Sequence, residues 1–409
     1  MAEILIILWT IAAVALGIPV LYLLLLSILA LFARSRPDRA APTTLHLCLV
    51  IPAHNEELTI ADTIRSGLAA GYPRDRFRVI VVADNCTDNT ATVARSAGAI
   101  VMERTHATLR GKGHALRWCF DALLNDTAPC DGIIVVDADS RISENFLRVV
   151  NACLNEGARV LQCSDLVQPQ PGVWSSEATR IGFLLYNYVR PLGRRVLGFP
   201  PGLRGNGMAF SASVLREVPW QAYTRVEDLE YGLILLLHGV HVTFAPEAVV
   251  LATMPAQARN AETQRARWEG GRIPVIRRYA PRLLVEGLRH ASPGMLDALL
   301  DLVTPALVNM IAVALVMTAI SVVLGVAVIP GLLTFGWIWA GIACAGVAHM
   351  GVGLYAARAD VSLYRSLLHI PRYVLWKLFL YARLTFRRKN SGEWIRTTRE
   401  SRPAGDGSR

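Results

Sequence analysis

The chain has 409 residues, of which 53% are hydrophobic and 18% are charged, and its formal net charge is +10. A disordered chain is excluded, because disorder requires few apolar residues and a high density of charge. The joint apolar and basic excess is also unusual for a cytosolic enzyme. It indicates membrane spans together with a surface that faces the phosphates of lipids, nucleotides or nucleic acid.

The chain begins with a long apolar segment. Residues 4–33 contain no charged side chain, and a helix of this length crosses a hydrocarbon core of roughly 30 Å. A secretory signal peptide is the alternative, but the segment is too long for one and Glu3 stands where basic residues are expected. We therefore predict a transmembrane helix over residues 1–33. Three arginines within residues 34–39 place the following chain in the cytoplasm by the positive-inside rule.

A cytoplasmic domain is predicted over residues 34–258. Five short apolar segments in it are typical of strands buried on both faces of a parallel sheet, and helical patterns separate them. The expected strands cover residues 45–51, 77–83, 99–102, 132–136 and 158–163, and the expected helices include 57–70 and 112–124. The predicted fold class is therefore α/β, a doubly wound domain with transmembrane helices at both ends of the chain.

Polar residues follow three of the expected strands, at the edge of the sheet where ligands bind in this fold class. They form the sequences Pro52-Ala53-His54-Asn55-Glu56-Glu57, Asp84-Asn85-Cys86-Thr87-Asp88-Asn89-Thr90 and Asp137-Ala138-Asp139-Ser140. Capped turns are the alternative explanation of the first two. Asp137 and Asp139 would repel one another at the end of a buried strand unless a cation lies between them. Mg²⁺ or Mn²⁺ bridging a diphosphate satisfies this requirement.

The C-terminal part of the chain holds the other predicted membrane segments. Residues 259–298 are expected to form interfacial helices, because eight arginines and three glutamates fall within 259–289. Residues 299–357 are expected to form two transmembrane helices with a turn at Ile329-Pro330-Gly331. An interfacial helix over 363–386 and a basic cytoplasmic tail complete residues 358–409, with a fourth span as the alternative for that helix. We predict a multi-pass protein of the inner (plasma) membrane whose middle domain is cytoplasmic.

Seven short motifs follow one another along the chain: P-A-H-N-E-E, D-N-C-T-D-N-T, G-K-G-H-A-L, D-A-D, G-N-G-M, V-E-D-L-E and Q-R-A-R-W. With these motifs in this order, the chain resembles the membrane-integrated family 2 glycosyltransferases. That group includes cellulose, chitin, hyaluronan and poly-N-acetylglucosamine synthases and ceramide glucosyltransferases. The resemblance covers about residues 45–279 and ends on an intact Q-x-x-R-W. It implies a nucleotide-sugar-binding domain of the glycosyltransferase A type.

The resemblance implies a site for a UDP-sugar and a divalent cation. Asp84 should accept a hydrogen bond from the uracil N3–H, and Asp139, with Asp137 beside it, should hold Mg²⁺ or Mn²⁺ and the diphosphate. Lys112 lies between glycines that allow close backbone approach to a nucleotide, with a solvated surface lysine as the alternative. The implied nucleotide-binding residues are Pro52, Ala53, Glu56, Asp84, Lys112, Asp137 and Arg267.

The resemblance further implies an inverting single displacement with Asp228 as the general base. Glu227 before it should raise its basicity or fix its orientation, although both acids could simply begin a helix. Val226 departs from the family pattern, which often has Thr there, and so weakens details of the pocket taken from the family. The implied acceptor-binding residues are Asn206, Gly207, Gln264 and Trp268. A plain glycine turn is the alternative around Asn206, as is contact with lipid headgroups for Arg267.

These expectations describe a membrane-bound UDP-sugar glycosyltransferase that transfers glucose or N-acetylglucosamine to a polysaccharide or a lipid. Q-x-x-R-W favours a polymer, whereas three spans favour a lipid acceptor, or a homo-oligomer or export partner that completes a channel. Between the two, polysaccharide assembly is the expectation. Polyprenyl-phosphate glycosyl transfer and a non-enzymatic nucleotide-sugar sensor are the alternatives. Nucleic-acid binding is not expected, because the basic charge is concentrated beside the membrane segments. Residues 34–39, 259–289 and 358–409 carry +2, +5 and +8, which leaves the rest of the chain at −5.

Overall fold

A computed structural model describes residues 2–34, 42–169, 174–253 and 258–369. The chain divides into two compact units. The first contains residues 1–34, 170–199 and 282–392, and the second contains residues 35–169, 200–281 and 393–409. Residues 170–199, which lie inside the predicted cytoplasmic domain, thus belong to the unit that holds the apolar helices.

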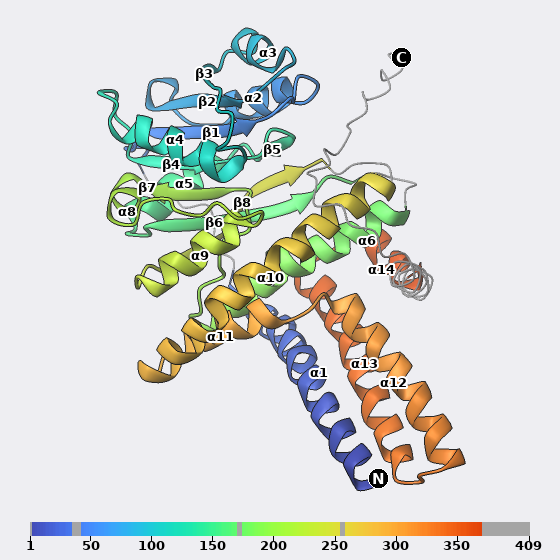
Figure 1. The fold of residues 1–409 in the computed structure, drawn as a ribbon. Helices are drawn as coiled ribbons and strands as arrows, with labels where there is room; N and C mark the ends of the chain where they lie inside the picture. Colours follow the sequence, from blue (N-terminus) through green and yellow to red (C-terminus); the bar gives the residue numbers. More distant parts are fainter. Residues whose placement is uncertain (1, 35–41, 170–173, 254–257, 370–409) are drawn as a thin grey trace, which may run out of the picture. The chain divides into compact units, whose positions relative to one another are not determined.

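The second unit is built on one mixed sheet (Figure 1). The eight strands found among its described residues are β1 (Leu47–Ala53), β2 (Phe77–Asp84), β3 (Ile100–Arg104), β4 (Gly132–Val135), β5 (Ser140–Ile142), β6 (Val160–Val167), β7 (Met208–Ser211) and β8 (Val242–Ala252), in the order β3-β2-β1-β4-β7-β6-β8-β5. Strands β1 to β4 pair in parallel, as do β6 and β8. Strands β7 and β5 run antiparallel to their neighbours.

The structure confirms an α/β fold and all five predicted strands, and it shows a mixed sheet rather than a parallel one. The chain reverses at the glycine turn before β7, so this four-residue strand enters between β4 and β6 in the opposite direction. Strands β5 and β7 are too short to give an apolar pattern, and β8 contains Pro246, which argues against a strand when the sequence is considered alone.

Helices cover both faces of the sheet, as a doubly wound arrangement requires. They are α2 (Ile60–Leu68), α3 (Thr90–Ser96), α4 (Lys112–Leu124), α5 (Phe146–Asn155), α8 (Ala212–Glu217) and α9 (Glu227–Leu237), with a short 3₁₀ turn η1 at Arg74–Arg76. Alternate residues of β1 point to opposite layers. Leu47, Leu49 and Ile51 pack with α2 and α5, whereas Cys48 and Val50 pack with α4 and α9. The central strands are therefore buried on both sides.

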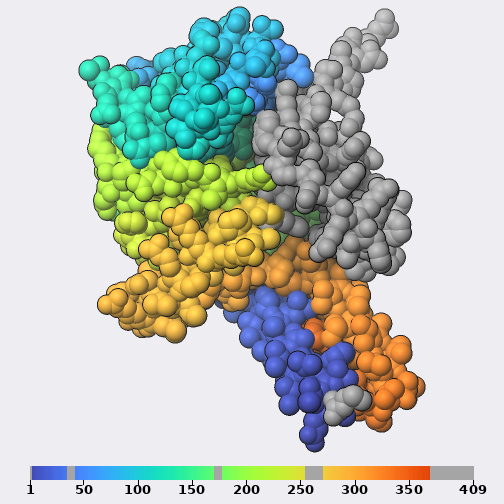
Figure 2. Space-filling model, viewed as in Figure 1, coloured from blue at the N-terminus to red at the C-terminus, as the bar shows by residue number. Residues whose placement is uncertain are grey.

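The first unit is helical. Its described helices are α1 (Ala2–Ala30), α6 (Trp174–Phe183), the π-helix η2 (Leu184–Val189), α7 (Arg190–Leu197), α11 (Pro293–Val303), α12 (Leu307–Ala327), α13 (Leu332–Ala356), α14 (Val361–Ser366) and η3 (Leu367–His369). Among the described residues, α1, α12 and α13 are long and apolar enough to cross a membrane. They lie side by side in the space-filling view (Figure 2). The predicted turn at 329–331 is confirmed, whereas most of the predicted helix over 363–386 lies outside the described residues.

Helix α10 (Ala258–Arg289) contains Q-x-x-R-W and runs from the second unit into the first. Within the second unit, Val275 and Tyr279 of α10 are buried. The Tyr279 hydroxyl donates a hydrogen bond to Glu230 Oε1 of α9, at 3.2 Å. Gly271 allows this packing, because a Cβ there would lie 3.1 Å from Arg225 Cβ. The α9–α10 contact therefore joins the helix that carries Glu227 and Asp228 to the segment that carries Q-x-x-R-W.

Candidate active site

The register of the sheet brings the predicted polar loops to one edge. Leu47 of β1 pairs with Phe77 of β2 and with Gly132 of β4, so the carboxyl ends of the three strands coincide. Pro52 and Ala53 end β1, Asp84 ends β2, and Asp137 follows β4. This is the edge at which an open α/β sheet binds its ligands.

The loops after β1 and β2 are hydrogen-bonded to each other. The Glu56 N–H donates to Thr90 Oγ1 at 2.7 Å, and the Thr87 N–H donates to Asn55 Oδ1 at 2.7 Å. Asn55 has a φ of 57°, in the left-handed region that asparagine tolerates better than most residues. The side chain of Glu56 accepts a hydrogen bond from Thr59 Oγ1 at 3.1 Å. These hydrogen bonds hold the two loops together beside Asp84.

Asp84 is held by Arg104, a residue that sequence reasoning missed. Both side chains are buried, and Arg104 Nη1 donates a hydrogen bond to Asp84 Oδ1, with 2.5 Å between the two atoms. The other guanidinium nitrogen, Nη2, donates to the Leu109 carbonyl at 2.7 Å. Arg104 ends β3 at the edge of the sheet. A charged residue at such a position normally indicates a solvated edge strand, so the sequence did not reveal its partner.

Lys112, at the start of α4, joins three parts of the site. Its Nζ lies 2.6 Å from Asp137 Oδ1, 2.7 Å from the Gly205 carbonyl oxygen and 3.8 Å from Glu227 Oε1. Burial lowers the pKa of Lys112, but Asp137 and Glu227 outweigh this effect and raise it above the usual value. The Lys112 ammonium therefore stays charged between two acidic loops, so it is not the solvated surface lysine of the alternative interpretation.

Gly113 beside it has a packing role. A Cβ there would lie 2.3 Å from the Ala222 carbonyl oxygen. The close backbone approach at this glycine is thus between α4 and residues 222–223.

Glu227 and Asp228 occupy the first turn of α9. Burial raises the pKa of Glu227 to about 7, with Lys112 opposing the rise and Asp228 adding to it. Burial also raises the pKa of Asp228 above its usual value, against Lys112. Such shifts are common where a carboxylate exchanges protons in a reaction. Two residues later in the same motif, Glu230 accepts hydrogen bonds from the Tyr223 and Thr224 amides, so it supports the start of α9.

The glycine turn at residues 204–207 lies between Asp228 and the loop after β4. Gly205 has a φ of 89°, and a Cβ there would lie 2.8 Å from Asp228 Oδ2. Gly207 has a φ of 70°, and its Cβ would lie 2.9 Å from Val250 Cγ2. Both positions therefore require glycine. Asn206 between them is buried, and its side-chain oxygen accepts a hydrogen bond from the Asp137 N–H at 3.0 Å.

Direct contacts join Lys112 to Asp137 and Glu227 and join Asn206 to Asp137, and the glycine turn lies against Asp228. The other predicted residues described in the second unit lie in the loops at this edge of the sheet or in that turn: Pro52, Ala53, Glu56, Asp84, Asp139 and Gly207. Gln264, Arg267 and Trp268 lie in α10, but their side chains fall outside the part of the chain that the structure describes. Their predicted contacts with diphosphate and acceptor therefore stay predictions.

The donor set after β4 fits a hard divalent cation with few protein ligands. Within the described residues, no group of three or more His, Cys, Asp or Glu side chains could hold a metal ion. Asp137 and Asp139 nevertheless share one loop, and the buried Asp165 lies close enough for both to raise its pKa, after the larger effect of burial. Two carboxylates suit Mg²⁺ or Mn²⁺ when diphosphate oxygens and water supply the remaining ligands.

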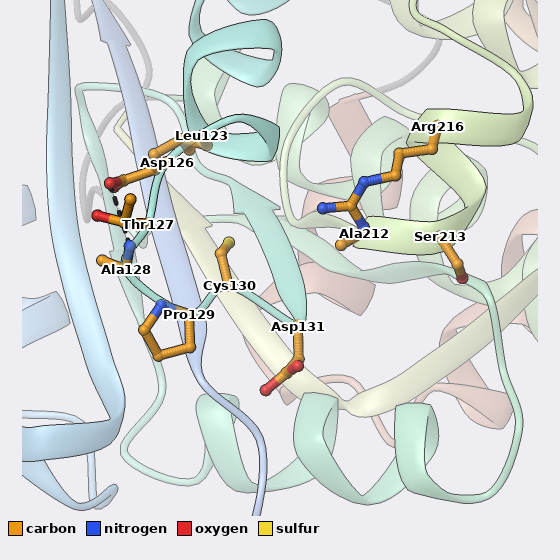
Figure 3. Close-up of a pocket in the computed structure, with 10 residues that line it drawn as sticks. All are labelled: Leu123, Asp126, Thr127, Ala128, Pro129, Cys130, Asp131, Ala212, Ser213 and Arg216. Carbon is orange, nitrogen blue, oxygen red and sulfur yellow. Dashed lines mark hydrogen bonds between the residues drawn. The ribbon is translucent and has the colours of Figure 1, made fainter.

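An open pocket of about 460 Å³ lies at the opposite edge of the sheet, at the amino end of β4 (Figure 3). Its acidic groups are already paired, Asp126 with Arg78 at 2.8 Å and Asp131 with the His46 N–H at 2.7 Å. None of the motif residues lines this pocket. The edge that carries Asp84 and Asp137 is therefore the stronger candidate.

Residues 43–271 match the family model described as glycosyltransferase like family 2. The chain belongs to this family. The family 2 chain is 25% identical over 240 residues to the probable glycosyltransferase YdaM of Bacillus subtilis, which covers 56% of each protein. It is 28% identical over 239 residues to the beta-monoglucosyldiacylglycerol synthase of Synechocystis sp., covering 55% of this chain and 47% of that protein. The chain thus spans about half the length of these curated relatives.

A 4,4'-diaponeurosporenoate glycosyltransferase of Staphylococcus aureus is 40% identical over 96 residues, covering 23% of this chain and 24% of that protein. Among solved structures, the mannosyltransferase PcManGT from Pyrobaculum calidifontis, in complex with GDP-Man and Mn²⁺, superposes with a TM-score of 0.50 and 17% identity. It covers 86% of this chain and 99% of that chain. The likeness shows a mixed α/β fold of the glycosyltransferase A kind for the family 2 chain.

Proposed function

We propose that the chain is a membrane-bound, inverting glycosyltransferase that takes a sugar from a UDP-sugar with the help of a divalent cation. The observation that carries this proposal is the contact of Lys112 with Asp137, Gly205 and Glu227. It joins the loop suited to a diphosphate, the glycine turn and the acidic pair at the start of α9. Family membership supports sugar transfer, and a nucleotide sensor would not need the acidic pair.

The donor lies across the carboxyl edge of the sheet in this proposal. Asp84 accepts from the uracil N3–H, with Pro52, Ala53 and Glu56 beside the nucleotide. Lys112, Asp137 and Arg267 face the diphosphate. A carboxylate also pairs with guanine, and PcManGT was solved with GDP-Man. The preference for uracil therefore needs a direct comparison of donors. Glucose and N-acetylglucosamine are the expected sugars.

Asp139 and Asp137 are the residues that would hold Mg²⁺ or Mn²⁺. When bound, the cation neutralises charge on the departing diphosphate. Lys112 adds a fixed positive charge at the same place, since its ammonium lies 2.6 Å from Asp137. Asp139 is therefore proposed as the main metal ligand, and Asp137, beside Lys112, would face both the cation and the diphosphate.

Asp228 is the proposed general base of a single displacement. The acceptor oxygen forms a bond to the anomeric carbon while the bond from that carbon to the phosphate oxygen breaks, and the acceptor proton passes to Asp228. UDP leaves with the electron pair of the broken bond. Glu227 keeps the Asp228 carboxylate basic, because a second buried acid beside it disfavours further negative charge. Gly207, Gln264 and Trp268 are the proposed acceptor contacts.

A membrane lipid is the acceptor that the comparisons favour. One relative is a synthase named for a glycosylated diacylglycerol, and three described helices are few to enclose a polymer channel. A polysaccharide acceptor is the second candidate, because Q-x-x-R-W is typical of polymer synthases. The polymer would need a homo-oligomer or an export partner. Polyprenyl-phosphate transfer is a special case of the lipid acceptor.

The proposed location is the inner (plasma) membrane, with the N-terminus outside and the catalytic unit in the cytoplasm. The apolar helices α1, α12 and α13 provide the spans. The arginines at 34–39 and 259–289 would face anionic headgroups on the cytoplasmic side.

The test uses the full-length protein in lipid nanodiscs with Mn²⁺, incubated separately with UDP-glucose, UDP-N-acetylglucosamine and GDP-mannose. Mass spectrometry of lipids and soluble glycans identifies donor, acceptor and product length. We expect a product from a UDP-sugar, and a loss of turnover of about 10²- to 10⁴-fold in Asp228→Asn with UDP affinity kept. Glu217→Gln, at an exposed acid, is the matched control. A product from GDP-mannose alone would contradict the donor, and turnover in Asp228→Asn would contradict the base.

A further inference from the structure

The side chain of Asn206 is fully engaged inside the protein. Its relative exposure is 3%, its Oδ1 accepts from the Asp137 N–H at 3.0 Å, and its Nδ2 donates to Ser140 Oγ at 3.0 Å and to Asp165 Oδ1 at 3.1 Å. An amide group has two N–H donors. Both are used here, so neither remains for a sugar hydroxyl.

These bonds reach both acidic residues of the loop after β4. Asn206 fixes the backbone at Asp137 directly. It reaches Asp139 through Ser140, whose buried hydroxyl donates to Asp139 Oδ1 at 3.3 Å. The amide of Asn206 therefore clamps the loop at residue 137 and at residue 140, the two ends of the segment that carries both carboxylates.

The Asp137 N–H fixes which way the amide of Asn206 points. This backbone group can only donate, so it requires the amide oxygen, and Nδ2 then faces Asp165 Oδ1 and Ser140 Oγ. A flipped amide would place its N–H groups against the Asp137 N–H. Buried polar groups left without partners in this way are costly. The hydrogen bond to the buried acid on β6 then holds the amide in this orientation.

The backbone of the turn is fixed as well. The buried Gln162 donates from Nε2 to the Asn206 carbonyl at 2.7 Å and accepts at Oε1 from the Arg204 N–H at 2.8 Å. The Gly207 N–H donates to the Val135 carbonyl of β4 at 3.0 Å. The turn is therefore held from β6 on one side and from β4 on the other.

We propose that Asn206 is a positioning residue. It holds the loop of Asp137 and Asp139 in the arrangement that receives the cation and the diphosphate of the donor, and Asp165 and Gln162 hold Asn206 in turn. This assignment replaces the expected contact between Asn206 and the acceptor. It rests on the proposed function, because it assumes that the loop binds a nucleotide diphosphate with a divalent cation. Groups that orient metal ligands commonly change metal affinity by about 10- to 100-fold when they are altered.

The experiment measures binding without the acceptor and so is independent of turnover. Full-length protein in nanodiscs is titrated with Mn²⁺ in the presence of UDP, and the electron paramagnetic resonance signal reports free Mn²⁺. We expect Asn206→Ala to weaken Mn²⁺ binding by about 10- to 100-fold while the KM for the acceptor, in residual turnover, stays close to the wild-type value. Asn125→Ala, at an exposed asparagine at the end of α4, should bind as the wild type does.

The exchange Asn206→Asp with Asp165→Asn provides the rescue. The amide introduced at position 165 would donate to the carboxylate introduced at position 206. That carboxylate would still accept from the Asp137 N–H, and the net charge is unchanged. We expect this double variant to regain a large part of the Mn²⁺ affinity lost in Asn206→Ala. If Asn206→Ala does not fold, the double variant and Ser140→Ala, which removes the link to Asp139, carry the test. Both should then fold, and Ser140→Ala should bind Mn²⁺ more weakly than the wild type.

Four results would overturn the inference. Unchanged Mn²⁺ binding with a raised acceptor KM in Asn206→Ala would return Asn206 to the acceptor site. Unchanged binding with only a lower melting temperature would make its role purely structural. A folded double variant that does not regain Mn²⁺ affinity would contradict the clamp. A folded Ser140→Ala that binds Mn²⁺ as the wild type does would contradict it as well. Failure of the wild type itself to bind Mn²⁺ with UDP would instead contradict the proposed function.

Discussion

Glu227 and Asp228 are adjacent buried acids, so their titration is a property of the pair. Burial raises the pKa of Glu227 to about 7 and also raises that of Asp228. A general base must be ionised before it accepts a proton. Turnover should therefore fall by about tenfold for each pH unit below the raised pKa of Asp228, so the acidic limb should lie above the usual range of an aspartate. The measurement is kcat/KM for the donor as a function of pH.

Glu227→Gln is the variant that isolates this effect. It removes the second ionisable group of the pair, and a neighbouring acid disfavours negative charge on Asp228, so the acidic limb of the profile should move to lower pH. Glu217→Gln, at an exposed acid away from the site, should leave the profile unchanged. An acidic limb that does not move in Glu227→Gln would show that a different group controls the rate.

Arg104 of β3 and Asp84 form a buried ion pair, in contrast to the exposed pair that Arg95 of α3 forms with Glu103 of β3. Removing one partner of a buried pair leaves a charge without compensation, at a cost of about 3–5 kcal/mol. An exposed pair contributes about 0–1 kcal/mol. Arg104→Met should therefore lower the melting temperature and weaken UDP binding in calorimetry, whereas Arg95→Met should change neither. Equal effects of the two substitutions would contradict the role given to Arg104.

At the scale of elements, Gly113 allows the start of α4 to pack closely against the backbone of residues 222–223. A Cβ there would meet the Ala222 carbonyl oxygen at 2.3 Å, a backbone atom that cannot move aside cheaply. Gly113→Ala should destabilise the protein by about 1–3 kcal/mol and displace the neighbouring Lys112. Gly270, inside α10, has no atom within 4 Å of its Cβ position, so Gly270→Ala should stabilise by up to about 1 kcal/mol. Denaturant unfolding and UDP titration would show the contrast.

Two results for Gly113→Ala would contradict all or part of this prediction. If Gly113→Ala and Gly270→Ala unfold at the same denaturant concentration, helix propensity alone would account for both glycines. If Gly113→Ala is destabilised but binds UDP normally, the packing argument would hold and the link to Lys112 would not.

The strands that the sequence predicted are those whose apolar residues are continuous, such as Val79–Val82 of β2, buried on both faces. Their order along the chain also predicts that Asp84 and Asp137 lie at one edge of the sheet. Strand β7 escaped prediction because four residues between a glycine turn and α8 carry no period. The sequence did not predict the roles of Arg104, Asp165 and Gln162 for another reason. Their roles depend on partners 20 to 44 residues away, which no local pattern encodes.

At the scale of the whole molecule, the division into units also could not be predicted. Residues 170–199 interrupt the second unit in sequence, and within them η2 and α7 pack with α1, and η2 with α13, in the first unit. Their composition gave no sign of this, because α7 carries three arginines among its eight residues. Gly193 explains the packing. A Cβ there would lie 2.3 Å from the Leu26 carbonyl oxygen of α1, so only glycine allows the two helices to approach this closely.

The arginines of α7 have their partners within the same unit. Arg194 is buried, and its guanidinium lies 3.0 Å from Asp297 and 3.1 Å from Asp301 of α11. It also donates to the Tyr22 hydroxyl of α1 at 2.8 Å. Arg190 adds a contact to Asp301 at 3.4 Å. Three segments far apart in the sequence thus meet at one buried, charge-balanced cluster.

This cluster should make Arg194 essential for the stability of the first unit. Arg194→Met leaves two buried carboxylates without their shared cation, at a cost of about 3–5 kcal/mol. Arg195→Met, at the partly exposed neighbour, is the matched control and should lie within about 0.5 kcal/mol of the wild type. Thermal unfolding in nanodiscs should therefore show a much lower midpoint for Arg194→Met alone. Adding Asp297→Asn should raise it again, because Arg190 and Asp301 then remain as one balanced pair. A double variant less stable than Arg194→Met would show that hydrogen bonding within the cluster, rather than charge balance, holds α7 against α1 and α11.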